Sequence, residues 1–226
     1  PQLSNYAQRY YSGPSGEVLD AFVFMRTDIG ENSQLSGKLG QHNLFWGETL
    51  LNPVHSLSYG QSGLDLAKLA ASPGTEAKEL FVPRNQLSTS LLVNPELTIG
   101  AQYFLDWNAA RLPEAGTFYG GSDLVGEGAQ SFLLGHTGTP GLIPVQGALT
   151  SIRRGHDLTP DKRGDWGVMA KWSPEWLGGT LGFYYRKTSE ILPQAWLDTR
   201  GLTVARGPFG NPPASFQGAV GNLYNS

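Results

Sequence analysis

The feature that most constrains the fold is an alternation of apolar and polar side chains that recurs in separate short windows. In residues 97–107 every second side chain is apolar, and residues 165–173 and 180–188 repeat the pattern. A period of two residues gives a β-strand two distinct faces, whereas an amphipathic helix needs a period of 3.6. Weaker versions of the alternation lie at residues 18–27, 34–46 and 86–93. The chain is therefore predicted to form about six strands, each with one apolar and one polar face.

The links between these windows alternate in length. Short, turn-rich links join the windows in pairs, at residues 28–33, 94–96 and 174–179. The other links, roughly residues 47–85 and 109–163, are several times longer and rich in Gly, Pro and polar residues. Antiparallel order then brings the short turns to one end of a sheet and the long loops to the other. This asymmetry is typical of an antiparallel transmembrane β-barrel of the outer membrane, with short periplasmic turns and long extracellular loops.

The composition and the tryptophans agree with a surface that lipid covers in part. Of the 226 residues only 15% are charged, against about 25% in an average soluble domain. Trp166 and Trp172 lie at opposite ends of one apolar face, as expected of residues at the two interfaces of a membrane. No apolar run is long enough for a transmembrane helix, which leaves strands as the means of crossing a membrane.

Residue counts exclude several kinds of chemistry. The absence of Cys excludes disulfides, thiolate catalysis and Cys-ligated metal centres. A net charge of −3 without a large cluster of Lys and Arg indicates no nucleic-acid partner. None of the 4 histidines has a His or carboxylate neighbour at metal-ligand spacing, so we expect neither a metal nor another cofactor.

The number of strands bears on the extent of the domain. About six strands cannot close a transmembrane barrel, for which the bacterial minimum is about eight, and an open edge in lipid leaves backbone groups unpaired. We therefore expect residues 1–226 to form one incomplete barrel domain, an internal portion of a longer chain. Residues 64–71 are expected to form a short loop helix followed by a further turn at 76–80, and residues 201–226 have the composition of a loop.

The polar faces of the strands would line the barrel lumen and supply candidates for a solute path. They mix charges with aromatic rings, which is unusual for a purely water-filled channel and favours a path for hydrophobic or amphipathic small molecules. The motif Phe45–Glu48, at the end of a predicted strand, offers an apolar platform and a polar anchor, although an interfacial tryptophan followed by a turn glycine fits it too. The candidates are Phe22, Phe24, Arg26, Trp46, Glu48, Gln102, Phe104, Asp106, Lys171, Tyr184 and Arg186.

Two alternatives remain at this point. A soluble extracellular β-sandwich acting as a binding module would show the same alternation, with its apolar faces packed into a core. A barrel-borne ester hydrolase could use Ser131 and His136, which are near in sequence, but a Gly-x-Ser-x-Gly elbow is lacking. We expect no catalytic residues and no enzymatic activity.

Several short motifs, taken in their order along the chain, resemble those of a known family. They are Val18–Phe24, Leu39–His42, Phe45–Glu48, Leu51–Val54, Ala77–Pro83, Tyr103 and Asp106–Trp107 with Arg111–Pro113, and Gly120–Asp123. Over roughly residues 17–190 the chain resembles the Gram-negative family known as domain of unknown function 1302 (DUF1302). One departure is Gln41-His42, where members more often carry a basic residue.

The resemblance implies an outer-membrane β-barrel in contact with membrane lipid and lipopolysaccharide, involved in the traffic of hydrophobic molecules. It further implies a periplasmic lipoprotein-like partner and an exporter-type inner-membrane pump, which are often encoded nearby. No catalytic residues are established in the family, so none is carried over to this chain.

Overall fold

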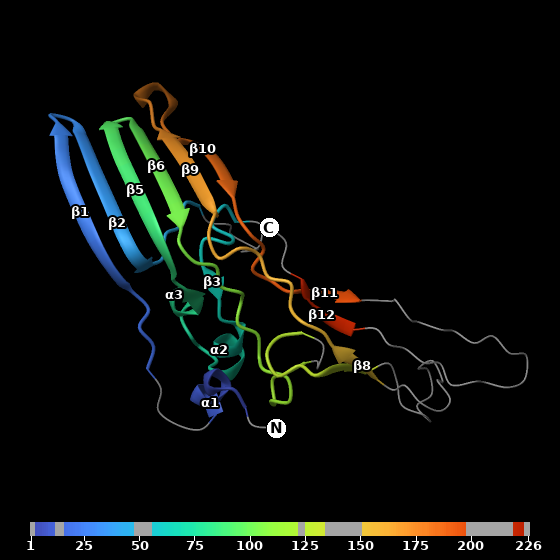
Figure 1. Cartoon of the computed structure of the whole chain (residues 1–226). Helices are drawn as coiled ribbons and strands as arrows, with labels where there is room; N and C mark the ends of the chain where they lie inside the picture. Colours follow the sequence, from blue (N-terminus) through green and yellow to red (C-terminus); the bar gives the residue numbers. More distant parts are fainter. Residues whose placement is uncertain are drawn as a thin grey trace, which may run out of the picture.

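The computed structural model describes residues 3–11, 16–47, 56–121, 125–133, 151–197 and 219–223. Its main body is a six-stranded sheet in the order β1-β2-β5-β6-β9-β10 (Figure 1). The strands are Ala21–Gly30 (β1), Ser33–His42 (β2), Arg84–Asn94 (β5), Leu97–Phe104 (β6), Trp166–Trp172 (β9) and Leu181–Lys187 (β10). Every neighbouring pair is antiparallel. The six strands predicted from the alternation are thus confirmed.

The short links lie at one end of this sheet. A two-residue turn at Glu31-Asn32 joins β1 to β2, and Pro95-Glu96 joins β5 to β6. The link between β9 and β10 carries the 3₁₀ helix η2 (Glu175–Leu177). Figure 1 shows all three links at its upper end, while the chain enters and leaves the longer connections at the lower end. The predicted asymmetry of the links is confirmed.

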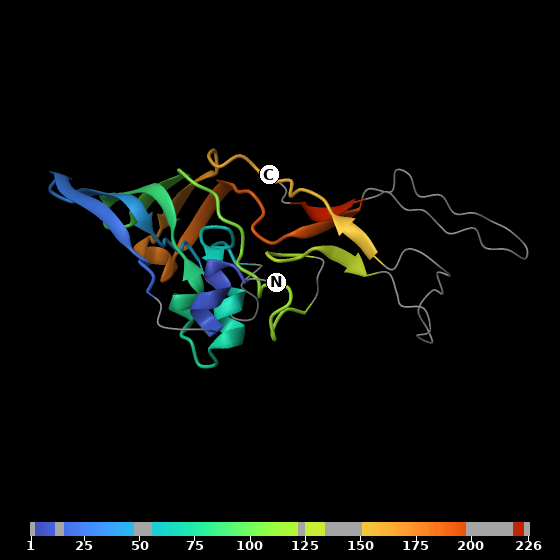
Figure 2. The same cartoon turned by 60° about the horizontal axis from the view of Figure 1, so that its bottom comes forward.

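The first long connection carries β3 (Gly63–Leu64), α2 (Leu66–Ala71), α3 (Ala77–Leu80) and β4 (Phe81–Val82). The predicted loop helix is confirmed, and it starts at Leu66 because Asp65 caps it, with Asp65 Oδ1 accepting the Lys68 N–H at 2.8 Å. The helix α1 (Asn5–Tyr11) was not predicted. Its Tyr10 hydroxyl donates to Asp65 Oδ2 at 2.8 Å, which holds α1 beside α2 (Figure 2).

A smaller sheet contains β7 (Ser131–Leu133), β8 (Ser151–Arg154), β11 (Gln194–Leu197) and β12 (Ala219–Leu223), in the order β11-β12-β8-β7. β12 runs parallel to β8, a pairing that the predicted antiparallel barrel does not include. β12 also corrects the prediction that residues 201–226 form only loop. It is a strand because it pairs with β8 and β11, which are contributed by other parts of the chain.

The large sheet is open, with β1 and β10 as its two edges, and the described strands do not close into a barrel. Its two faces differ in composition. We call the face that carries Arg26, Lys38, Ser88, Gln102 and Lys171 the inner face, and the opposite face, which carries Val23, Leu39, Leu87, Ile99 and Val168, the outer face. Lys187, at the end of β10, is the charged residue among the outer-face residues of the six strands.

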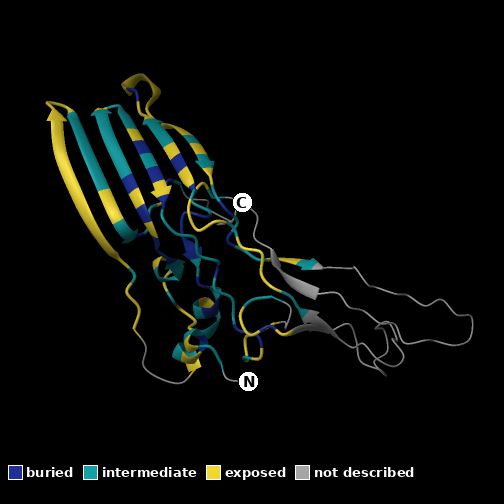
Figure 3. Ribbon diagram, viewed as in Figure 1, coloured by how far each residue is buried: buried dark blue, intermediate teal, exposed yellow. Residues whose placement is uncertain are grey.

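Burial on the two faces is inverted relative to a soluble sheet (Figure 3). On the central strands β5 and β6 the polar inner-face residues are covered, with Gln86 and Gln102 0% and 3% exposed, whereas the edge strand β1 is exposed on both faces. Apolar outer-face residues are open: Val23 is 76% and Phe183 61% exposed. A β-sandwich buries its apolar faces, so the sandwich alternative does not fit this sheet.

The helices within the described segments are all too short or too polar to cross a lipid bilayer.

Candidate functional site

The segment that follows β2 folds back over the inner face. Trp46 is only 4% exposed, and its ring lies on Gly167 of β9, where an added Cβ would come within 2.8 Å of the ring. The Tyr184 hydroxyl of β10 donates to the Trp46 carbonyl at 3.3 Å. The strand predicted to reach residue 46 ends at His42. The interpretation of Trp46 as an interfacial residue at a strand end is therefore wrong, because its side chain is enclosed by protein.

A chain of amide side chains fastens this segment to the sheet. Gln61 Nε2 donates to Gln102 Oε1 at 2.7 Å, and Gln102 Nε2 in turn donates to Gln86 Oε1. Gln86 Nε2 donates to the His42 carbonyl at 2.6 Å, and Gln61 Oε1 accepts the Trp46 N–H at 3.2 Å. Buried amides are tolerated only when they are hydrogen-bonded in this way. The candidate Gln102 is therefore a structural residue, because it links Gln61 of the covering segment to Gln86 of β5.

A buried ion pair lies at the end of the inner face nearest the long connections. Arg84 is fully buried, and its Nη2 lies 3.0 Å from Asp165 Oδ2. Its guanidinium stacks on Phe104, with Cζ 3.9 Å from the ring centroid. Asp165 Oδ1 accepts the Ser189 N–H and hydroxyl, both at 2.9 Å. The candidate Phe104 therefore supports a satisfied ion pair and does not face open space.

Arg186 of β10 also anchors the covering segment. Its guanidinium donates to the Leu57 carbonyl and, at 2.7 Å, to the Tyr59 carbonyl. The Tyr59 hydroxyl donates to Glu190. Burial, together with this hydrogen bond, raises the pKa of Tyr59 above its ordinary value, so the phenol keeps its proton. Arg186 is held by two carbonyls and is not free to meet a solute.

Beside this packed region the inner face holds a cavity of about 340 Å³, which we call the inner cavity. Four of the candidates predicted from the sequence meet in it: Phe24, Arg26, Trp46 and Lys171. Its remaining lining residues are Met25, Ser36, Gly37, Lys38, Leu44, Phe45, Ser88, Thr89, Ser90 and Met169. Phe22 lies next to it, with Lys38 Nζ 4.9 Å from the Phe22 ring centroid. Strands β1, β2, β5 and β9 supply the walls, and Leu44–Trp46 covers them.

The other ten lining residues were not predicted as site residues, although the sequence pointed to several of them. The alternation assigns Lys38 and Met169 to the polar faces of their strands. Phe45 belongs to the motif Phe45–Glu48 and lies in a segment with no regular secondary structure.

Other predicted residues lie elsewhere. Asp106 was expected on a strand, but β6 ends at Phe104, two residues before it. Its carboxylate accepts the Asn85 backbone N–H at 3.1 Å and Asn85 Nδ2 at 2.6 Å, at the end of the sheet and outside the inner cavity. Glu48, His136 and the side chain of Ser131 lie outside the described residues. Within the described segments no three His, Cys, Asp or Glu side chains gather closely enough to hold a metal ion.

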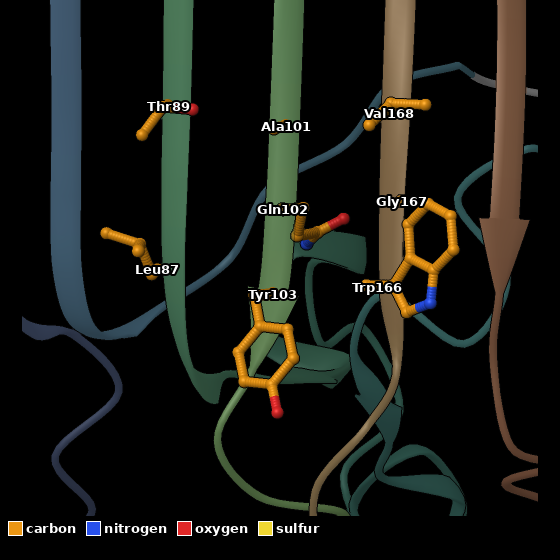
Figure 4. Close-up of a pocket in the computed structure, with 8 residues that line it drawn as sticks. All are labelled: Leu87, Thr89, Ala101, Gln102, Tyr103, Trp166, Gly167 and Val168. Atoms are coloured by element: carbon orange, nitrogen blue, oxygen red, sulfur yellow. The ribbon is translucent and has the colours of Figure 1, made fainter.

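The outer face has a shallow hollow of about 270 Å³, drawn in Figure 4. Thr89, Ala101 and Val168 lie in one row across β5, β6 and β9, and Leu87, Tyr103 and Trp166 lie in the next row. Tyr103 and Trp166 are register partners on β6 and β9 and lie at the same level of the sheet. Trp172 lies at the other end of β9 on the same face, opposite Leu97. Along β9 the outer face thus has a tryptophan at each end, with the aliphatic residues Val168 and Ala170 between them.

Fold and site together define a mostly β protein whose antiparallel sheet exposes an apolar face and carries, on its covered polar face, a cavity lined by aromatic and cationic side chains. The chain belongs to the family described as protein of unknown function (DUF1302), whose model matches residues 2–222. This match confirms the resemblance inferred from the motifs. Neither the curated proteins nor the solved structures contain a match to the chain.

Proposed function

We propose that the six-stranded sheet is part of the wall of an outer-membrane β-barrel, and that the inner cavity binds or passes hydrophobic or amphipathic small molecules without covalent chemistry. The inverted burial of the sheet carries the proposal. In a bilayer the outer face meets hydrocarbon, so its exposed apolar residues cost nothing, whereas in water the same face would favour aggregation.

The aromatic residues support a membrane orientation. Trp166 and Trp172 are separated by six residues along β9, which corresponds to about 20 Å at about 3.3 Å per residue. The apolar band of outer-membrane barrels is about 25 Å tall and is flanked by aromatic girdles. The outer face between the two tryptophans carries no charge.

A closed barrel would need further strands at the two open edges of the sheet. All residues of β1 are exposed, and β10 forms the opposite edge. Because unpaired N–H and C=O groups cost several kcal/mol each in hydrocarbon, both edges have to pair with strands beyond this sheet to close a barrel. Lipid and lipopolysaccharide are then the partners of the outer face.

The inner cavity supports the choice of ligand class. A water-filled pore needs a polar lumen, yet the lining of this cavity includes the apolar residues Phe24, Phe45, Trp46 and Met169. The family resemblance adds, as part of the proposal, a periplasmic lipoprotein-like partner and an inner-membrane pump that exchange such molecules with the barrel.

Localisation and binding can be tested on the whole protein. We expect it in the outer-membrane fraction, soluble only with detergent, and migrating differently on a gel before and after boiling. The folded protein should bind the uncharged fluorescent probe N-phenyl-1-naphthylamine. Trp46→Ala should weaken this binding about tenfold, which is about 1.4 kcal/mol, whereas Trp176→Ala, at a 74% exposed link position, should leave it unchanged. Recovery of the folded protein in aqueous buffer without detergent would contradict the proposal.

A further inference from the structure

The inner cavity is positively charged. Arg26, Lys38 and Lys171 line it, and no carboxylate is present among its described lining residues. Arg26 lies opposite Ser36 on β2, and Lys38 is two residues further along the same face. Such diagonal neighbours in a sheet are about 7 Å apart, within reach of a common ligand for long side chains. Lys171, on the inner face of β9, lines the same cavity.

These three cations have no counter-ion in the part of the chain that the structure describes. None of them forms an ion pair there. The carboxylate on the inner face of β1, Asp28, accepts a hydrogen bond from Gln34 Nε2 at 2.6 Å and does not line the cavity. Arg84 is different, because the fold supplies it with Asp165. A cationic side chain that has no carboxylate partner within the fold is available to an anionic group of a ligand.

The lining of the inner cavity also includes apolar side chains, which lie beside the cations: Phe24 is the register partner of Lys38, and Met169 is two residues from Lys171 on β9. Phe24, Phe45 and Trp46 supply rings, and Met169 lies across Gly100, where an added Cβ would come within 2.7 Å of the methionine Cε. A thioether side chain adjusts to ligands of different shape. Ser36, Ser88 and Ser90 add hydroxyl groups to the lining.

We propose that the inner cavity recognises a single-chain amphiphile with an anionic head group. The head group contacts Arg26, Lys38 and Lys171, and the chain lies against Phe24, Trp46 and Met169. A volume of about 340 Å³ is at the lower end of ligand pockets, about 300–1,000 Å³, which favours one hydrocarbon chain over two. This inference rests on the proposed function and adds the charge and the size of the ligand to it.

The test compares ligands with the same chain and different head groups. The full-length protein in phosphatidylcholine nanodiscs is titrated calorimetrically with dodecanoate, dodecyl phosphate, dodecylammonium and dodecanol, and empty nanodiscs correct for partition into lipid. We expect dodecanoate and dodecyl phosphate to bind at least tenfold more tightly than dodecylammonium and dodecanol. Lys38→Gln and Lys171→Gln should each remove about tenfold of that preference, about 1.4 kcal/mol. Lys187→Gln, on the outer face, serves as the matched control and should retain the full preference.

The outcomes separate the inference from the proposed function. Equal binding of all four ligands would overturn the anionic preference while leaving an amphiphile site in place. No binding of any of them, or of N-phenyl-1-naphthylamine, by protein that still shows heat-modifiable migration would overturn the proposed function as well. Dihexanoylphosphatidylglycerol, which has two chains, is included as a competitor. If it displaced dodecanoate more strongly than dodecyl phosphate does, the single-chain assignment would be wrong.

Discussion

Replacing Ile99 by lysine would put one charge on the outer face between its two aromatic ends. Ile99 is 43% exposed and lies two residues from Leu97, the partner of Trp172, and four from Tyr103, the partner of Trp166. At about 3.3 Å per residue these separations are about 7 Å and about 13 Å. The new ammonium group would therefore lie well inside the apolar band.

The magnitude depends on what the outer face touches. A lysine on the lipid face near the bilayer midplane costs about 2–4 kcal/mol in outer-membrane barrels. The same substitution at a water-exposed position changes the free energy of unfolding by about 0.5 kcal/mol or less. We expect the larger value. The assay is urea unfolding of the protein reconstituted in lipid vesicles, with the free energy taken by linear extrapolation.

Phe118→Lys is the matched control, because Phe118 is 89% exposed and lies outside the sheet. It should change the free energy of unfolding by no more than about 0.5 kcal/mol. If Ile99→Lys were as stable in vesicles as Phe118→Lys, the reasoning that the outer face contacts hydrocarbon would be refuted.

Three further substitutions test the inner face, each followed by urea unfolding. Arg84→Met leaves Asp165 buried without its cation and should cost about 3–5 kcal/mol; adding Asp165→Asn should recover part of that loss, and no recovery would contradict the ion-pair account. Gly167→Val pushes a side chain into the Trp46 ring and should cost about 1–3 kcal/mol while weakening binding of N-phenyl-1-naphthylamine; unchanged binding would show that Trp46 does not need this glycine. Trp46→Ala should itself cost about 3–5 kcal/mol, and a smaller loss than about 1 kcal/mol would mean that the ring is not packed as described.

The large sheet could be predicted from the sequence because its information is local. Alternation along a strand such as Trp166–Trp172 needs no knowledge of the neighbouring strands, and a turn such as Pro95-Glu96 is encoded by the residues that form it. Burial could not be predicted in the same way. The pattern identifies a polar and an apolar face, but which one protein covers depends on where residues 43–47 and 56–62 fold.

The parts that sequence reasoning missed depend on contacts between distant residues. Arg84 and Asp165 are separated by 81 positions, and nothing near either residue indicates the other. β12 is a strand only through its pairing with β8 and β11. The burial of Trp46 depends on Gly167, a residue whose lack of a side chain carries no sequence signal of its own.

The central claim is that the outer face contacts lipid and the inner face does not. Because the chain has no cysteine, single cysteines at Leu87, Ser88, Thr89 and Ser90 of β5 can each carry a nitroxide spin label in the vesicle-reconstituted protein. The measurement is the accessibility of each label to oxygen, which concentrates in hydrocarbon, and to a water-soluble nickel chelate. We expect labels at Leu87 and Thr89 to be accessible to oxygen and shielded from nickel, and labels at Ser88 and Ser90 to be shielded from hydrocarbon. Nickel accessibility at Leu87 and Thr89 equal to that of a label at Phe118 would contradict the claim.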